Sequence, residues 1–215
     1  QTVHAIRCAH VEAKGAINGI GLVKIMGRLS GHIAANAALA QNDTNFVLIP
    51  EVPFALHGNK GFLSYLEKRI KASGHAVILV AEGAGQDLLR NHTDTIETDP
   101  SGNLRLYDIG IFLKNEIEKY FQKINLEINL KYIDPSYMIR SVPANAADSI
   151  YCGSLGQDAV HAAMAGKTGL LVALMKGEYV HLPLSAAASR RKIDPRGEVW
   201  LRVLEATGQP PVMED

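Results

Sequence analysis

The sequence predicts an α/β fold in which a mostly parallel β-sheet lies between two layers of helices. Short apolar runs of strand type recur along the chain, and those at 46–51 and 76–81 are apolar enough to be buried on both faces. Amphipathic segments long enough for several helical turns stand between these runs. Strands that alternate with helices in this way form βαβ units, whose strands run parallel with helices on both faces.

The first elements alternate as this fold requires. Residues 2–14 carry apolar side chains at helical spacing, and Gly15 ends the pattern. Residues 20–25 form an apolar run that predicts the first strand. The alanine-rich segment 31–41 follows as a helix.

The middle of the chain repeats the pattern. A second strand is predicted at 46–51, and an amphipathic helix at 61–73 ends at Gly74, a residue typical of helix C-termini. The apolar run 76–81 predicts a third strand. Residues 86–107 are polar and predict a mobile loop.

The remaining elements follow the same logic. Residues 109–124 form a strongly amphipathic helix, and 129–133 form a fourth strand. Asp134-Pro135 suits the N-cap and first position of a further helix. The last predicted elements are a helix from Asn145 to about Ala165, a fifth strand at 169–175, an extended segment at 179–182 and a helix at 198–207.

Composition bounds the partners and the compartment. Lys plus Arg and Asp plus Glu are 22 each, so bulk charge predicts neither a nucleic-acid partner nor an anionic membrane surface. The apolar runs are too short to span a bilayer. Two cysteines far apart, Cys8 and Cys152, favour a reducing compartment, so we expect a cytoplasmic protein. The chain opens on Gln1, already inside a helical pattern, and we expect it to be a piece of a longer protein.

In parallel sheets ligands bind at the carboxyl ends of the strands. The first strand ends at Met26-Gly27-Arg28 and feeds the helix at 31–41. Backbone N–H groups at that helix start, together with the Arg28 guanidinium, suit an anionic ligand such as a phosphate ester. An ordinary strand-to-helix turn with a solvated Arg28 is the alternative.

Other strand ends carry further candidates. Glu82 follows the third strand and precedes two glycines, so its carboxylate can accept from paired sugar hydroxyls; a solvated loop glutamate is the alternative. Tyr137 and Arg140 lie three residues apart and share a helical face, as a ligand pair or as a surface pair. Lys131 precedes the turn at Pro135 and Arg140 follows it, so the two cations could converge there. Glu51 fits either a hydroxyl acceptor or a simple strand terminus.

Several motifs are absent from the sequence. It contains no GxxxxGK[ST], no GxGxxG after a strand, no HExxH and no GxSxG. The eight histidines show no metal-ligand spacing, so we expect no metal site and assign no catalytic residue in this chain.

Four segments together resemble the 6-phosphofructokinases of the glycolytic type, in the branch that includes plant enzymes and bacterial forms with a P-S-Y-x-I-R-S segment. The similarity extends over essentially the whole chain. The segments are Met26-Gly27-Arg28-x-Ser30-Gly31, Ile49-Pro50-Glu51, Ala81-Glu82-Gly83-Ala84-Gly85-Gln86-Asp87 and Tyr132-Ile133-Asp134-Pro135-Ser136-Tyr137-Met138-Ile139-Arg140-Ser141.

The resemblance implies a phosphofructokinase-like three-layer sandwich of Rossmann-like topology, present in part. It implies that Met26, Gly27 and Arg28 touch fructose 6-phosphate, with Arg28 also near the transferring phosphoryl group. Glu82 is expected to hold sugar hydroxyls. Tyr137 and Arg140 are expected to hold the sugar and its 6-phosphate. Lys131 matches an arginine that, in the common bacterial branch, reaches the substrate of a neighbouring subunit.

The sequence also departs from that family. The glycine-rich GGD(G/D)T donor loop and the T-x-D-N-D segment with the catalytic aspartate do not occur. Gly19 stands where the common bacterial branch has an arginine, which puts that contact in doubt. Mg²⁺ with ATP or pyrophosphate is therefore expected in the full-length enzyme and not at this chain's own motifs. The full-length form is expected to be a homo-oligomer.

These observations divide the chain into a fructose-6-phosphate-binding domain at 1–144, a helix and strand returning to a donor-binding domain at 145–185, and a C-terminal tail helix at 186–215. The leading hypothesis is the substrate-binding portion of a 6-phosphofructokinase, a glycolytic kinase that makes fructose 1,6-bisphosphate, with this chain inactive alone. A non-catalytic sugar-phosphate-binding fragment is the alternative. An unrelated α/β hydrolase or isomerase needs a general base among Glu51, Glu82 and Asp87.

Overall fold

The computed structural model describes residues 1–89, 98, 102, 105–187 and 192–214. The chain divides into two compact units. The first comprises Gln1–Arg140 and Lys192–Asp215, and the second comprises Ser141–Arg191. Each unit is described by itself.

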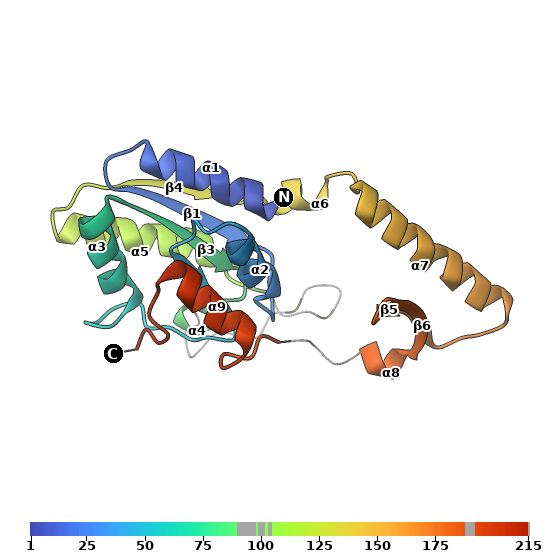
Figure 1. Cartoon of the computed structure of the whole chain (residues 1–215). Coiled ribbons are helices and arrows are strands. Elements are labelled where there is room, and N and C mark those ends of the chain that lie inside the picture. The colour runs from blue at the N-terminus through green and yellow to red at the C-terminus, as the bar shows by residue number, and fades with distance from the viewer. Residues whose placement is uncertain (90–97, 99–101, 103–104, 188–191, 215) are drawn as a thin grey trace. The chain divides into compact units, whose positions relative to one another are not determined.

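A four-stranded sheet forms the centre of the first unit (Figure 1). Its strands are β1 (Gly19–Ile25), β2 (Phe46–Leu48), β3 (His75–Ala81) and β4 (Asn129–Ile133). The strand order is β2-β3-β1-β4, and all three neighbouring pairs are parallel. The predicted α/β class and parallel sheet are confirmed.

Helices connect and cover these strands. They are α1 (Thr2–Lys14), α2 (His32–Ala40), α3 (Phe62–Ser73), α4 (Gln86–Leu89), α5 (Ile109–Lys123), α6 (Ser136–Arg140) and α9 (Glu198–Thr207). Most bounds lie within a residue or two of the predicted ones. The predicted strand 46–51 is regular only over Phe46–Leu48, because Pro50, which lacks an N–H, lies just beyond.

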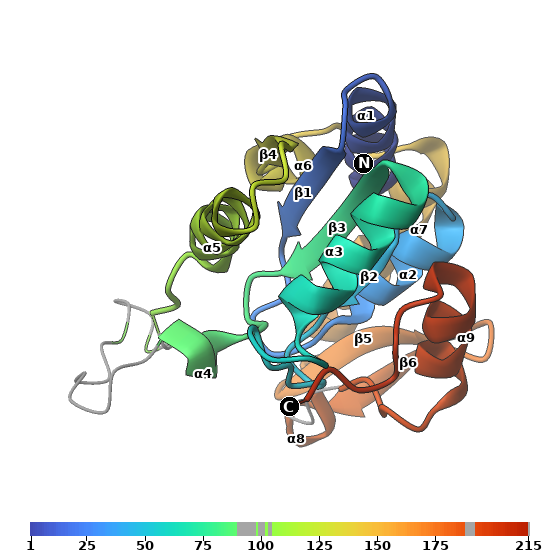
Figure 2. The same cartoon turned by 90° about the vertical axis from the view of Figure 1, so that its left-hand side faces the viewer.

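Alternating side chains of the central strands build a core on each face of the sheet. Ile20 and Leu22 of β1 pack with apolar side chains of α3 and α5. Val23 and Ile25 of the same strand pack with α1, α2 and α9. Helices therefore cover both faces, which gives the three layers that the sequence predicts (Figure 2).

The outer edge of β2 is closed by the C-terminal part of the chain. The side-chain oxygen of Gln209, a residue only 6% exposed, accepts from Val47 N at 2.6 Å. Its amide nitrogen donates to Val47 O at 3.3 Å. A single side chain thus satisfies backbone groups that an edge strand otherwise leaves open.

The segment between β3 and α5 contains the predicted polar loop and the start of the next predicted helix. In the polar segment 86–107, α4 occupies Gln86–Leu89, and most of the predicted mobile loop, including its Pro100-Ser101 turn, lies outside the described residues. Asp108 caps α5 by accepting from Gly110 N at 3.0 Å and Ile111 N at 3.1 Å.

The second unit contains α7 (Ala146–Met164), β5 (Leu170–Met175), β6 (Glu178–Pro183) and α8 (Leu184–Ala187). β5 and β6 pair antiparallel in a sheet of their own instead of extending the parallel sheet. Lys176 and Gly177 link them with φ of 51° and 88°, the left-handed backbone of a tight hairpin turn. The expected fifth strand is therefore half of a hairpin.

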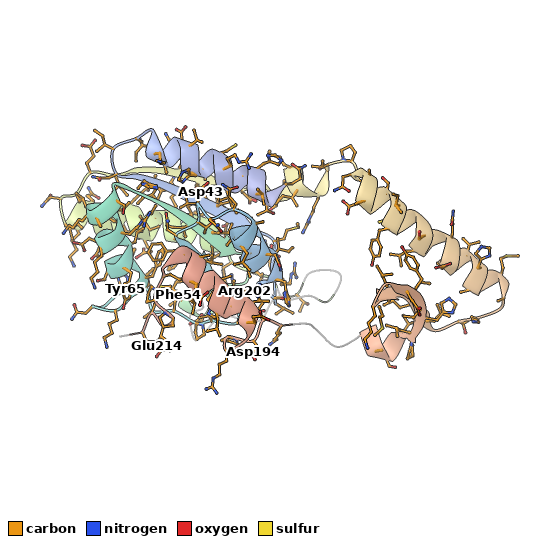
Figure 3. The ribbon with its side chains drawn as sticks, in the orientation of Figure 1. Asp43, Phe54, Tyr65, Asp194, Arg202 and Glu214 are labelled. Atoms are coloured by element: carbon orange, nitrogen blue, oxygen red, sulfur yellow. The ribbon has the colours of Figure 1, made fainter. Side chains whose placement is uncertain are left out.

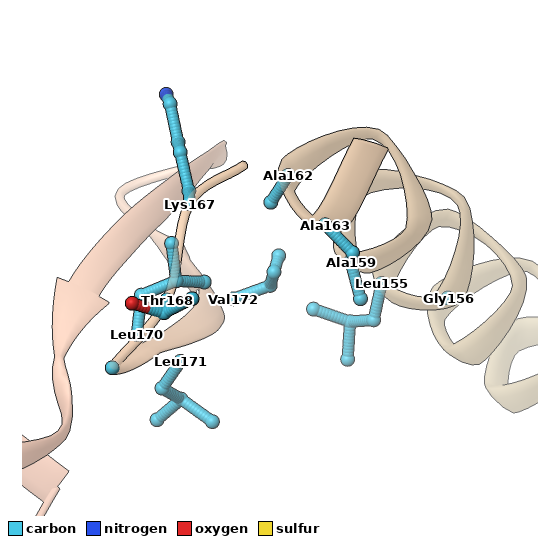
Figure 4. Close-up of a pocket in the computed structure, with 11 residues that line it drawn as sticks. Leu155, Gly156, Ala159, Ala162, Ala163, Lys167, Thr168, Leu170, Leu171 and Val172 are labelled. Atoms are coloured by element: carbon cyan, nitrogen blue, oxygen red, sulfur yellow. The ribbon is translucent and has the colours of Figure 1, made fainter. Parts of the chain in front are cut away.

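The second unit leaves much of its apolar surface uncovered. Ala162 is the buried residue of α7, whereas Ile150, Val160 and Met164 are 72%, 61% and 83% exposed. An open hollow of about 530 Å³ lies between α7 and β5, lined by small and aliphatic side chains such as Ala159 (Figure 4). No helix in the described part of the chain is long and apolar enough to cross a membrane. The division at 144 and 185 by function stays a prediction.

Candidate functional site

The carboxyl ends of the four parallel strands lie along one edge of the sheet. Ile25 pairs with Ala81, Val23 pairs with Ile133, and Leu48 pairs with Val80. The segments that follow these strands therefore leave the sheet on the same side. Ligands of open parallel sheets bind at this edge, so it is the candidate site.

The loops after β1 and β3 continue to contact each other beyond the sheet. Glu82 N donates to Ile25 O at 2.9 Å, and Gly83 N donates to Gly27 O at 3.1 Å. A Cβ on Gly83 would lie 1.9 Å from the carbonyl oxygen of Arg28, so the absence of a side chain permits this approach. Glu82 and Arg28 are thereby held on directly adjoining backbone.

Arg140 joins this group from a position 114 residues along the chain. Its Nε donates to the Sδ of Met26 at 2.9 Å, which ties the end of α6 to the residue after β1. At the start of α6, Asp134 Oδ1 accepts from Ser136 N at 3.1 Å, as the predicted N-cap should. Tyr137 lies on the same short helix and is 85% exposed.

Five of the predicted substrate residues thus lie on adjoining segments at one edge: Met26, Gly27, Arg28, Glu82 and Arg140. Tyr137 lies one helical turn from Arg140 on α6. Lys131 lies apart from them, because it pairs with Gly21 within β4 and is exposed before that strand ends. In the described part of the chain, no hydrogen bond or ion pair joins Lys131 to the other six.

Glu51 binds backbone groups of its own protein. Its two carboxylate oxygens accept from Gly31 N at 3.0 and 2.9 Å, and Oε1 also accepts from Ile193 N at 3.0 Å. The expectation that the N–H groups at this helix start serve an external anion is wrong for Gly31, because an internal carboxylate already accepts from it. Glu51 instead ties the start of α2 to the segment before α9.

Lys24 lies within β1 and forms ion pairs with two carboxylates. Its Nζ lies 3.0 Å from Asp108 Oδ2 and 2.9 Å from Asp134 Oδ2, and the Lys24 side chain is 14% exposed. Burial disfavours the charged ammonium, but the hydrogen bonds with Asp134 and Asp108 outweigh burial and raise the pKa of Lys24. The ammonium therefore stays charged at neutral pH.

A family model described as Phosphofructokinase matches residues 1–163. An ATP-dependent 6-phosphofructokinase of Borreliella burgdorferi is 51% identical over 222 residues, covering 100% of this chain and 49% of that protein.

The chain belongs to the phosphofructokinase family.

Other phosphofructokinases align in the same way. An ATP-dependent 6-phosphofructokinase of Amycolatopsis methanolica is 51% identical, with 95% of this chain and 46% of that protein covered. ATP-dependent 6-phosphofructokinase 7 of Arabidopsis thaliana is 47% identical, with 96% and 43% covered. The chain thus spans about half the length of these relatives.

Solved phosphofructokinase structures share the fold. A pyrophosphate-dependent phosphofructokinase from Marinobacter aquaeolei superposes with a TM-score of 0.64 at 20% identity, and the match covers 100% of this chain and 53% of that one. The T-state phosphofructokinase of Pichia pastoris gives a TM-score of 0.56 at 20% identity, with 96% and 21% covered. At this identity the likeness concerns the fold alone.

Sequence reasoning on this phosphofructokinase chain missed Lys24. The available signal was a charged side chain inside an otherwise apolar strand, Gly19–Ile25. A lysine with most of its side chain buried needs a partner of opposite charge. The partners come from distant turns, so the sequence did not identify them.

The Lys24 ion pairs predict a pH dependence of stability. Burial raises the pKa of Asp134, but hydrogen bonds from Ser136 and Lys24 outweigh it and lower that pKa below its usual value. A depressed carboxyl pKa adds stability above the unfolded pKa of about 4, and this contribution is lost as the pH falls through the folded pKa. The free energy of unfolding, measured by urea titration, should therefore fall below about pH 4 more steeply for the unmodified chain than for Asp134→Asn. Parallel curves would contradict the assignment.

Proposed function

We propose that the chain forms the sugar-phosphate-binding portion of a 6-phosphofructokinase. The whole enzyme would transfer a phosphoryl group to the C1 hydroxyl of fructose 6-phosphate and form fructose 1,6-bisphosphate in glycolysis. Relatives about 50% identical over nearly the whole chain are named ATP-dependent 6-phosphofructokinases, which supports this proposal. The observation that carries it is the gathering of Met26, Arg28, Glu82 and Arg140 at one edge of the sheet.

The chemistry of these side chains fits a phosphorylated ketose. Arg140 and Arg28 supply guanidinium groups, whose N–H donors match phosphate oxygens. A guanidinium has five N–H donors, so the bond from Arg140 Nε to Met26 leaves further donors available for a phosphate. We assign Arg140 to the 6-phosphate and Arg28 to the region of the transferring phosphoryl group, where a cation stabilises developing charge.

The remaining residues would hold the sugar. Glu82 is half-buried beside two glycines. It is assigned to the sugar hydroxyls, because a carboxylate accepts hydrogen bonds from hydroxyl groups. Tyr137 is assigned to the sugar through its phenol. Met26 and Gly27 would contact the substrate beside Arg28, and Gly27, with φ of 150°, has no side chain to obstruct it. Lys131 is assigned to the substrate of a neighbouring subunit in a homo-oligomer, which accounts for its place apart from the others.

The names of the relatives favour ATP as the phosphoryl donor, with Mg²⁺ expected beside it in the whole enzyme. Within the described part of the chain no group of three or more His, Cys, Asp or Glu side chains could hold a metal ion. We therefore assign no residue of this chain to Mg²⁺. We place the whole enzyme in the cytoplasm, where glycolysis takes place.

A second candidate is a sugar-phosphate-binding fragment that catalyses nothing. Two facts favour it for the chain by itself: the chain spans about half the length of its relatives, and it carries neither a GGD(G/D)T nor a T-x-D-N-D segment. By itself the chain should bind fructose 6-phosphate without turning it over. A coupled assay for fructose 1,6-bisphosphate with ATP and Mg²⁺ tests this directly.

Replacing Arg140 with alanine tests the assignment of the phosphate. Because it removes charge-assisted hydrogen bonds, the change should weaken fructose 6-phosphate binding by about 1.5–3 kcal/mol, measured by calorimetry. Arg202→Ala is the matched control, since Arg202 lies on α9 (Figure 3) and forms an ion pair with Glu198. An affinity of Arg140→Ala equal to that of the control would reject Arg140 as a phosphate ligand.

A further inference from the structure

The ammonium of Lys24 connects the starts of two helices. Asp108, one of its partners, caps α5 by accepting from Gly110 N and Ile111 N. Asp134, the other partner, caps α6 by accepting from the N–H and hydroxyl of Ser136 at 3.1 and 2.5 Å. Each carboxylate thus bonds a helix start and the same cation. Lys24 fixes both helix starts to β1.

A second attachment, at the other end of α6, is to the residue that follows β1. Arg140 Nε donates to Met26 Sδ at 2.9 Å, and Met26 is two residues after Lys24. Between these attachments Ile139 N donates to Pro135 O at 2.9 Å, which closes the first turn of α6. A helix of five residues has little stability of its own, so its position depends on such outside contacts.

We propose that Lys24 is a positioning residue for the proposed substrate site. Through Asp134 it sets where α6 begins, and thereby where Tyr137 and Arg140 lie relative to Met26-Gly27-Arg28. The inference rests on the proposed function in so far as Tyr137 and Arg140 bind fructose 6-phosphate. The hold of Lys24 on α6 is a separate physical claim that needs no ligand.

Position 24 requires a positively charged side chain. A methionine of similar length could fill the space within β1, but it would leave two carboxylates near each other without a cation. Asp108 would still accept from Gly110 N and Ile111 N, and from the Tyr132 hydroxyl at 3.5 Å. Asp134 would keep its bonds with Ser136, a residue of α6 itself, and would lose its ion pair with β1.

The test compares Lys24→Met with variants that break one ion pair at a time. Asp134→Asn removes the charge that joins Lys24 to α6, and Asp108→Asn removes the charge that joins it to α5. Lys71→Met removes an exposed ion pair with Glu67 on α3 and serves as the control. Each variant is examined by amide ¹H–¹⁵N spectra of the ligand-free chain and by calorimetry with fructose 6-phosphate.

In the spectra, Lys24→Met and Asp134→Asn should both shift the amide resonances of residues 136–140, whereas Asp108→Asn should act mainly on residues 109–112. In calorimetry, Lys24→Met and Asp134→Asn should raise the dissociation constant roughly tenfold, the change expected when a displaced Arg140 loses about one charge-assisted hydrogen bond to the phosphate. Lys71→Met should match the unmodified chain in both measurements. If Lys24 contributed to stability alone, Asp134→Asn and Asp108→Asn would change the dissociation constant to a similar extent.

Two results would overturn the proposal. One is a set of resonances for residues 136–140 that stays unchanged in both Lys24→Met and Asp134→Asn. The other is unchanged affinity in these variants while Arg140→Ala binds more weakly. If the unmodified chain binds no fructose 6-phosphate, the proposed function fails for this chain, and the ligand-free spectra alone decide whether Lys24 holds α6.

Discussion

Replacing Gly83 with alanine should weaken fructose 6-phosphate binding by about tenfold or more, which corresponds to the loss of at least one charge-assisted hydrogen bond. The added Cβ would lie 1.9 Å from the carbonyl oxygen of Arg28 and 2.6 Å from its carbonyl carbon. These are backbone atoms, so the loop after β1 or the loop after β3 has to move. Either movement separates Arg28 from Glu82, two residues that we assign to the same ligand. Calorimetric titration with fructose 6-phosphate measures the effect.

The same substitution should also lower the free energy of unfolding by about 3 kcal/mol, the upper end of the usual cost of overpacking. Gly153→Ala is the matched control, because a Cβ on that helical glycine meets nothing within 4 Å. Gly153 belongs to the second unit and is not one of the residues of the sheet edge. If Gly83→Ala bound fructose 6-phosphate as the control does, the close approach of the two loops would have no part in binding.

Truncating Trp200 to alanine should lower the free energy of unfolding by about 3–5 kcal/mol, the usual loss for a buried tryptophan. Trp200 lies on α9, is 1% exposed and belongs to the core on the α1 and α2 face of the sheet. α9 packs against α2, the helix that follows the Arg28 loop. Urea unfolding should be followed by circular dichroism, because Trp200 is the only tryptophan in the sequence and its fluorescence is lost with it.

Leu201→Ala provides the comparison for this change. Leu201 is the next residue of α9 and is 49% exposed, so its truncation should cost well under 1 kcal/mol. A loss for Trp200→Ala as small as that for Leu201→Ala would mean that α9 contributes little to the core of the first unit.

The sequence predicted the central strands well because their pattern has a single physical explanation. The six consecutive apolar residues at 76–81, all buried, can hardly be accommodated except between two covering layers. The sequence predicted β5 but not its pairing with β6 in a hairpin, because Leu170–Met175 looks like any other apolar run. The signal for its turn was Lys176-Gly177, and a turn of this kind gains its meaning only when both flanking runs are strands.

The candidate site was predictable where residue type and strand end coincide. Glu82 directly follows β3 and Arg28 lies three residues after the end of β1, and the register of a parallel sheet brings such positions together. The roles of Glu51 and Lys24 could not be predicted from local sequence. Their partners, Ile193 for one and Asp108 with Asp134 for the other, lie far along the chain and become neighbours only through the fold.

The strand order also has a consequence for how the chain folds. Both neighbours of β1 are strands that lie much further along the chain: Gly19 pairs with His75 on one side and with Asn129 on the other. A strand with such distant partners must wait for large loops to close before it gains any hydrogen bonds, and topologies of this type fold slowly. During synthesis on the ribosome, the apolar residues of β1 therefore have neither sheet partner until β3 has emerged, and they lack the second until β4 has emerged.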